Sequence, residues 1–407
     1  MLTRLFGPHN LELAEDVVQA AFVAALETWG SAGMPDNPAA WLLTTARRRA
    51  IDAIRRERTR RTFAADLSRY LDGEWTLTTT VREAFGEDVI RDDQLRMIFM
   101  CCHPDLSADS QLTLILRTLC GLSVPATARA LLTTEATVHK RMVRIRQRLK
   151  GVEFALPRPA DRPAALETTH AALYLLFNEG HLSTEEEPIR RELCHAAMEL
   201  VRLVADEPSL CSSDTLGLLA LMCFNAARMD SRLDANGEVV PLDRQDRSRW
   251  DRELIGRGYR CLVRASQMEA LVASRYHLEA AIAARHCAAR AFAETDWVSI
   301  CSLYDRLVEL GPSPLAELNR AVALSYRDGP EVAIPLVEEI RRSGRLAGSP
   351  AVAAVLANLY ARAGAAEPSR LYLEEALASA RTRHERQLIA LQVERALGSY
   401  AGGSKTG

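Results

Sequence analysis

The strongest constraint in this 407-residue sequence is the segment Ser123–Lys150, in which apolar and basic side chains each repeat at helical spacing. The apolar repeat consists of Val138, Met142, Ile145 and Leu149. Its spacing predicts a helix that buries these four side chains on one side. A shorter helical segment precedes it at about 124–132 and is joined to it through Thr133 and Thr134. Thr134 is expected to cap the second helix. The segment therefore predicts two helices joined by a turn, the arrangement of a helix-turn-helix.

Polar and basic side chains occupy the other side of the second predicted helix. Arg and Lys donate hydrogen bonds to phosphates and to guanine edges, so this side suits duplex DNA. The residues predicted to contact the duplex are Thr134, Glu135, Thr137, Lys140, Arg141, Arg144 and Arg148. The alternative is a solvated basic helix on an unrelated α-helical domain.

A second basic helix is predicted upstream, at Pro38–Glu57. Its apolar stripe includes Leu42, Ala46 and Ile54, while Trp41 and several Arg residues fall on another side. An aromatic ring beside guanidinium groups suits unstacked single-stranded bases, because the bases offer π-faces and the backbone is negative. The competing interpretation is that Trp41 packs in a core and the arginines are solvated.

Three stretches in order resemble an extracytoplasmic-function (group 4) sigma factor of bacterial RNA polymerase: LAEDVVQAAFVAAL, PAAWLLTTARRRAIDAIRRE and GLSVPATARALLTTEATVHKRMVRIRQRL. The resemblance covers residues 11–57 and 92–150. It implies that the first domain binds the polymerase clamp and melts the −10 promoter element, while the second holds the −35 element in the major groove. Core RNA polymerase and promoter DNA are the partners that this resemblance implies.

The resemblance also assigns residues to each contact. Polymerase binding is expected at Glu15, Asp16, Gln19 and Phe22. Reading of the −10 element is expected at Asn37, Trp41, Thr45, Arg48, Asp52, Arg55 and Arg56. The chain departs from the family at Ala126 and Thr127, where many members have an acidic residue and Ile. Its first ten residues supply only part of the usual opening helix, which is therefore short or truncated.

The composition and the positions of proline residues predict an all-α protein with several domains. Hydrophobic residues make up 48% of the chain and aromatic residues only 6%, with Ala, Leu and Arg abundant, which favours helices over sheets. We expect a sigma region 2 domain at 1–57, a linker at 58–91, a region 4 helix-turn-helix domain at 92–151 and a helical extension at 157–400.

The extension carries a repeat of about 35 residues from about residue 277. It is seen where 323–340 and 359–377 superpose, with Gly329 aligned to Gly364 and Glu339 to Glu374. Its period resembles tetratricopeptide helix pairs, whose stacked surface binds a peptide or protein. A sigma factor with such an extension resembles a known subgroup in which the extension regulates the sigma domains in cis. A regulatory protein or peptide is a further expected partner of the repeat surface.

The segment DRQDRSRWD concentrates charge and an indole within the extension. We predict a cis-regulatory contact with the sigma domains or polymerase at Asp243, Arg244, Asp246, Arg247, Trp250 and Asp251. An equally weighted alternative is that these residues join helices within the extension.

Other function classes find little support. No nucleophile elbow, phosphate-binding glycine loop or metal motif is present, so we expect no enzyme activity, cofactor or metal site. No apolar run reaches bilayer length and no signal peptide is visible, so we expect a cytoplasmic protein without a membrane partner. The nine cysteines, without a C-x-x-C pair, predict buried thiols. The remaining alternative is a helix-turn-helix transcriptional regulator with a helical scaffold, not a polymerase subunit.

Overall fold

The computed structural model describes residues 11–32, 41–42, 44–46, 48–49, 92–149, 156–183, 187–268, 273–311 and 313–403. Within these ranges every named element is a helix, and one isolated antiparallel bridge joins Leu233 to Val239. The predicted all-α fold class is therefore confirmed. In the described part of the chain, no helix is both long and apolar enough to cross a membrane.

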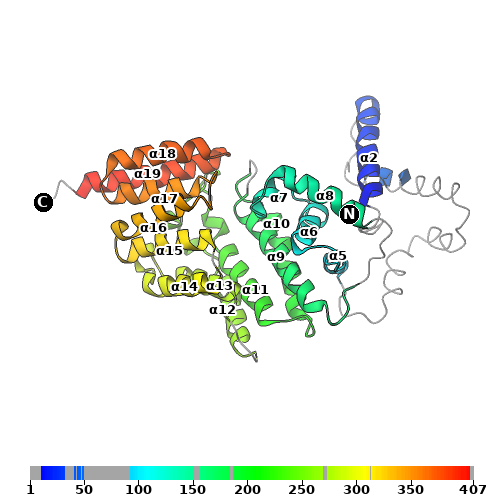
Figure 1. Cartoon of the computed structure of the whole chain (residues 1–407), viewed down its shortest axis with the longest axis horizontal. Helices are drawn as coiled ribbons and strands as arrows, with labels where there is room; N and C mark the ends of the chain where they lie inside the picture. The colour runs from blue at the N-terminus through cyan, green and yellow to red at the C-terminus, as the bar shows by residue number, and fades with distance from the viewer. Residues whose placement is uncertain are drawn as a thin grey trace, which may run out of the picture. The chain divides into compact units, whose positions relative to one another are not determined.

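The chain divides into two compact units, residues 1–172 and 173–407. The division falls inside one uninterrupted helix, α9 (Arg162–His181). The other helices of the first unit are α2 (Leu11–Ala32), α5 (Asp93–Cys101), α6 (Ala108–Leu114), the π-helical turn η3 (Ile115–Leu119), α7 (Val124–Ala130) and α8 (Glu135–Leu149) (Figure 1).

The start of α9 completes the core of the first unit. Ala165 and Thr169 are buried, and the Cys102 thiol donates to the Ala165 carbonyl oxygen at 3.6 Å. Thr168 donates to the Gln111 side-chain oxygen on α6 at 3.0 Å. Residues 162–172 therefore pack with α5 and α6, as part of the same compact unit as α7 and α8.

The second unit begins with the rest of α9, and four helices follow it in the chain. They are α10 (Arg191–Asp206), α11 (Ser213–Ala226), α12 (Arg252–Ser266) and α13 (Arg275–Ala288). The stretch 215–224 of α11 is buried at every position, which makes α11 the central helix. Gly258 lets α12 approach it closely, because a Cβ there would lie 2.8 Å from the Phe224 ring.

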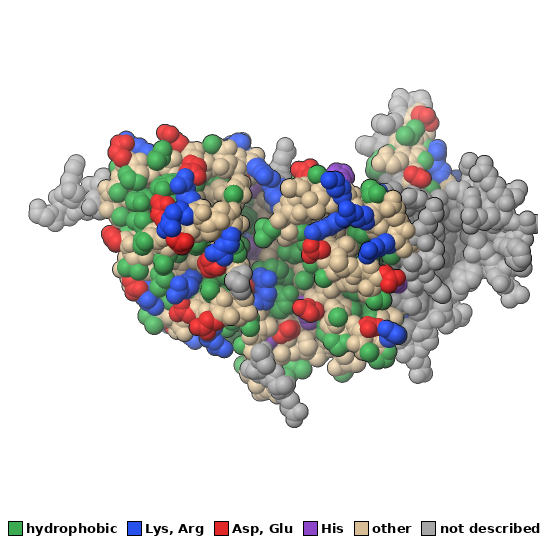
Figure 2. Space-filling model, in the orientation of Figure 1, with side chains coloured by type: hydrophobic (Ala, Val, Ile, Leu, Met, Phe, Trp, Pro, Cys, Tyr) green, Lys and Arg blue, Asp and Glu red, His purple; other side chains and the backbone are tan. Residues whose placement is uncertain are grey.

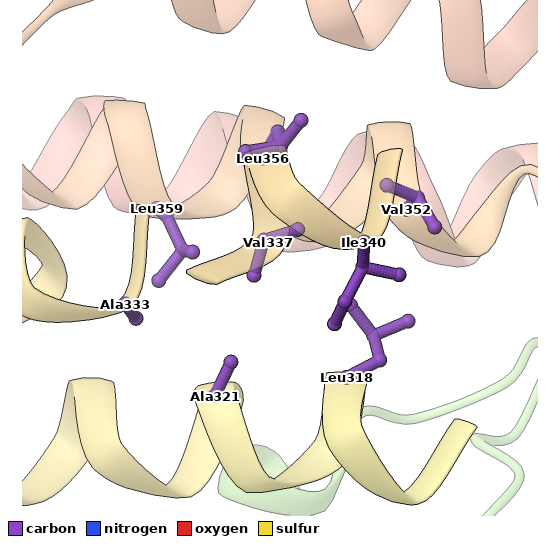
Figure 3. Close-up of a cluster of buried hydrophobic side chains, with 8 residues drawn as sticks. All are labelled: Leu318, Ala321, Ala333, Val337, Ile340, Val352, Leu356 and Leu359. Carbon is purple, nitrogen blue, oxygen red and sulfur yellow. The ribbon is translucent and has the colours of Figure 1, made fainter. Parts of the chain in front are cut away.

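Successive helices then pack on one another to the C-terminus (Figure 1). They are α14 (Trp297–Leu310), α15 (Pro314–Arg327), α16 (Pro330–Ser343), α17 (Ala351–Arg362), α18 (Ala366–Ser379) and α19 (Arg383–Gly403). Figure 3 shows apolar side chains of α15, α16 and α17 pointing toward one another in a shared core. Gly329 and Gly364, which the sequence repeat aligns, both have positive φ, +103° and +76°, in the turns before α16 and α18. Glycine is favoured there because other residues adopt positive φ at a cost.

Candidate nucleic-acid interface

Capping residues set the bounds of α7 and α8. The Ser123 hydroxyl accepts from the Ala126 N–H at 3.2 Å at the start of α7. The Thr134 hydroxyl accepts from the Thr137 N–H at 3.2 Å, so the predicted cap of α8 is confirmed. The first helix ends at Ala130, two residues before the expected end, because Leu132 has φ +48° and cannot continue a right-handed helix.

The predicted apolar seam of α8 is confirmed. All four of its residues are buried: Val138, Met142, Ile145 and Leu149. Burial of this seam holds α8 against α6 and α7, and it leaves the opposite side of α8 in solvent.

Basic side chains gather over the exposed side of α8 (Figure 2). Lys140 and Arg144 lie one turn apart and are both exposed. Glu135, in the first turn, is the helix's single acidic residue. The exposed side therefore combines hydrogen-bond donors with net positive charge, as contact with nucleic acid requires.

Two predicted DNA-contacting arginines of α8 are held by other parts of the first unit. Arg141 forms an ion pair with Asp109 of α6, with Nη2 2.6 Å from Oδ2. Arg148 donates from Nη1 to the Asp105 carbonyl oxygen at 2.9 Å. Thr137 is half-buried beside the Thr134 hydroxyl. Arg141 must therefore share or release Asp109 before it contacts a base.

The exposed side of α8 also carries residues that were not predicted. His139, Val143 and Gln147 recur at steps of four and are all exposed. The prediction followed the helix start and the basic residues, and therefore omitted these neighbours. Their positions opposite the apolar seam were the signal that could have identified them.

Three of the residues expected to bind polymerase share one face of α2. Asp16, Gln19 and Phe22 are exposed at steps of three, and Phe22 is 53% exposed. Val17 and Ala21 lie buried on the same helix. The side chain of Glu15 lies outside the described residues. An exposed phenylalanine next to polar residues is a feature of protein-binding surfaces.

The residues expected to read the −10 element are only partly described. Trp41 and Thr45 are half-buried and Arg48 is exposed, in a stretch whose described residues are helical. The others, Asn37, Asp52, Arg55 and Arg56, lie outside the described residues, as does the predicted linker 58–91.

Two of the six residues predicted to make a cis-regulatory contact are buried, Arg247 and Trp250. Trp250 is 3% exposed and donates from Nε1 to the Ser231 hydroxyl at 2.8 Å. Arg247 is 7% exposed, lies 4.8 Å over the Trp250 ring and donates to the Ala289 carbonyl oxygen at 2.9 Å. These contacts all lie within the second unit, so Arg247 and Trp250 join its helices.

The other members of this segment lie nearer the surface. Asp251 caps α12 by accepting from the Glu253 and Leu254 N–H groups at 2.8 and 3.0 Å. Asp243 is half-buried, and the exposed side chains are those of Arg244, Asp246 and Asp251. A contact with another body would therefore involve the exposed side chains and not the indole.

Comparison with known proteins identifies two families in the chain. Residues 2–60 match Sigma-70 region 2, and residues 165–266 match a family of unknown function (DUF6596). The chain is 36% identical over 394 residues to the uncharacterized protein R00370 of Rhizobium meliloti (strain 1021), which covers 95% of this chain and 90% of that protein. No solved structure matches the chain significantly. The chain therefore belongs to the same family as the Rhizobium protein.

Proposed function

We propose that this chain, a sigma-70 family protein by its region 2 domain, is an extracytoplasmic-function sigma factor. It binds core RNA polymerase and directs promoter-specific transcription initiation. The observation that carries the proposal is the region 2 match at residues 2–60, because this domain in sigma factors binds the polymerase clamp and melts the −10 element. The exposed face of α2, with Asp16, Gln19 and Phe22, supplies a surface for the clamp.

Helices α7 and α8 act as the helix-turn-helix that reads the −35 element. Lys140 and Arg144 lie on the exposed side of α8, and the helix carries one carboxylate, that of Glu135 in its first turn. Arg144 is the residue best placed for a bidentate contact to guanine, since Arg141 is already paired with Asp109. Lys140 suits a phosphate contact, which positions the helix without selecting sequence.

The tetratricopeptide-like extension regulates the sigma domains in cis in this proposal. Support comes from α9, which packs against α5 and α6 through residues 162–172 and continues into the second unit without a break. The family of unknown function also begins at residue 165, inside that helix. A conformational change in the extension can therefore be transmitted through α9 to α5 and α6.

Run-off transcription with purified core polymerase and a promoter library tests the proposal. The wild-type chain should produce promoter-dependent transcripts. The double variant Asp16→Ala/Gln19→Ala should lose core binding and transcription, while Glu27→Ala, exposed on the same helix, should retain both. Wild-type core affinity in the double variant contradicts the clamp assignment.

Copurification separates the proposal from the competing regulator. A sigma factor copurifies with core polymerase in the absence of DNA, whereas a helix-turn-helix repressor or activator binds its operator alone. A chain that binds a duplex tightly and leaves core polymerase in the flow-through supports the regulator instead.

Truncation tests the cis-regulatory role of the extension. A cut after residue 156 would strip Ala165 and Thr169 from the core of the first unit, so it confounds regulation with unfolding. A chain ending at residue 172 retains this packing. We expect its transcript yield with core polymerase to differ from that of the full chain, and equal yields exclude regulation in cis.

A further inference from the structure

Three arginines of the second unit cluster beside Trp250. Arg232 is 6% exposed and Arg247 7% exposed, whereas Arg228 is half-buried. The Arg228 and Arg247 guanidinium carbons lie 5.7 and 4.8 Å from the centre of the Trp250 ring. Besides burial, the charge of Arg247 helps to lower the pKa of Arg228, and the charge of Arg228 helps to lower the pKa of Arg232, so the three guanidinium groups lie near one another. We call Arg228, Arg232 and Arg247 the buried arginine cluster.

Backbone carbonyls satisfy part of this cluster. Arg247 donates to the carbonyl oxygens of His286 and Ala289, and Arg232 donates to that of His181. Arg247 Nη2 and Arg228 Nε remain buried without an acceptor. His181 Nε2 and His286 Nδ1 are likewise buried and unpartnered. Four buried nitrogen atoms on these side chains therefore lack an acceptor. Burial lowers the pKa of both histidines, and both lie close enough to Arg228 for its charge to lower their pKa further.

The cluster also lacks a counter-charge. Among the described residues, none of its arginines forms an ion pair, although Glu294 acts on Arg247 from a distance. Elsewhere in the unit, Arg191 pairs with Asp230 at 2.7 Å and Arg202 with Glu199 and Asp206, each at 2.5 Å. Burial of an unpaired charge is costly, and such groups in proteins are normally matched by an opposite charge.

The protonation states keep this positive charge in place near neutral pH. Burial lowers the pKa of Arg228 to about 10 and that of Arg232 to about 9, so both stay charged at pH 7. Burial, with Arg228 and Arg247 adding to it, lowers the pKa of His286 to about 3. His286 is therefore neutral and can donate one N–H without adding charge.

We propose that the buried arginine cluster binds a small tetrahedral oxyanion, either inorganic phosphate or the phosphate group of a nucleotide. A phosphate offers acceptors in several directions and carries the opposite charge, and guanidinium groups bind it in a bidentate way. Half-buried Arg228 gives the anion access from solvent. The site goes beyond promoter recognition, because it places a ligand in the extension, far along the chain from α8.

Thermal unfolding and calorimetry of the full-length protein test the site. We expect inorganic phosphate to raise the melting temperature saturably above its value in sodium chloride of equal ionic strength. Arg228→Met should abolish this response and change the melting temperature in chloride only slightly, because it removes an unpaired charge together with its contact to Trp250 and keeps side-chain volume. Arg202→Met, a surface arginine with carboxylate partners, should keep the wild-type response.

A second variant and a comparison of ligands identify the ligand and separate a loss of binding from misfolding. Arg228→Lys keeps the charge but loses the planar guanidinium group that binds phosphate in a bidentate way, so phosphate affinity should fall about tenfold or more. A nucleoside monophosphate that binds more tightly than phosphate identifies a nucleotide site, and equal affinity identifies free phosphate. A response that does not saturate and is equal in wild type and Arg228→Met is a general salt effect and overturns the proposal. Equal melting temperatures in phosphate and chloride also overturn it.

Discussion

Arginines on α8 and arginines in the buried cluster beside Trp250 have the same chemistry and opposite surroundings. On α8, Arg144 is exposed, and the partner of Arg141 is Asp109, whose side chain is 63% exposed. In the second unit, Arg232 and Arg247 are more than nine-tenths buried and have no carboxylate partner in the described chain. The difference teaches that exposure, not residue type, decides whether an arginine can exchange partners.

The physical reason is the dielectric environment. A surface ion pair contributes only about 0–1 kcal/mol, because water solvates both charges when they separate. Arg141 can therefore leave Asp109 for a phosphate or a base at little cost. A buried guanidinium has no such solvent to replace a lost partner, so its contacts are costly to change. The α8 set suits reversible DNA binding, and the buried set suits structure or a specific ligand.

The largest expected effect is on Trp250, at the centre of the buried set. Trp250→Ala should lower the free energy of unfolding by about 3–5 kcal/mol, because it removes a buried ring and the cation–π contacts of Arg228 and Arg247. Urea denaturation measures this loss. Trp250→Phe keeps most of the ring and loses the hydrogen bond to Ser231, so its loss should be smaller. A loss below about 1 kcal/mol for the alanine variant would contradict the structural role of the indole.

Acid should destabilise the buried region next. The folded-state pKa of His286 is lowered to about 3 from an ordinary value of 6.5, so its contribution to stability is present above pH 6.5 and is lost as the pH falls toward 3. The linkage relation gives a loss of roughly 2 kcal/mol between pH 7 and pH 5. Urea midpoints across this range measure the effect. His286→Gln should flatten the profile, and an unchanged slope in that variant assigns the pH dependence elsewhere.

On the exposed set, Arg144→Ala should weaken −35 binding by about 1–3 kcal/mol if the side chain is bidentate to guanine. Fluorescence anisotropy with a −35 duplex measures the change, and thermal unfolding should be nearly unaffected, since Arg144 is exposed. Arg158→Ala, exposed in the same unit but outside α8, is the matched control. Equal binding by wild type and Arg144→Ala would place the −35 contact on another part of the helix.

The smallest effect is expected at the ion pair between α6 and α8. Asp109→Asn should change the free energy of unfolding by about 0–1 kcal/mol, because the Asp109 carboxylate is exposed to solvent. It should also free Arg141, so Arg141→Ala should weaken duplex binding more in the Asp109→Asn background than in wild type. A double-mutant cycle measures this difference. A loss of stability well above that range shows that the ion pair is structural.

The exposed basic set was predictable to a large extent, and the buried arginine cluster was not. The apolar repeat at Val138, Met142, Ile145 and Leu149 is local, and helix geometry alone places these residues on one side. Arg141 was predicted on the exposed side as well, but its partner Asp109 lies 32 residues away. Periodicity within one helix carries no information about such a partner.

The sequence by itself determined the all-α class, the cap and seam of α8, and the glycine positions of the repeat, because each depends on contacts within a few residues. It left two roles open for Arg247 and Trp250. Only the tertiary structure decided that both lie in the interior of the second unit, where Ser231 and Ala289 supply their partners. The physical reason is that burial and hydrogen-bond satisfaction depend on which helices meet, and residues distant in sequence make that choice together.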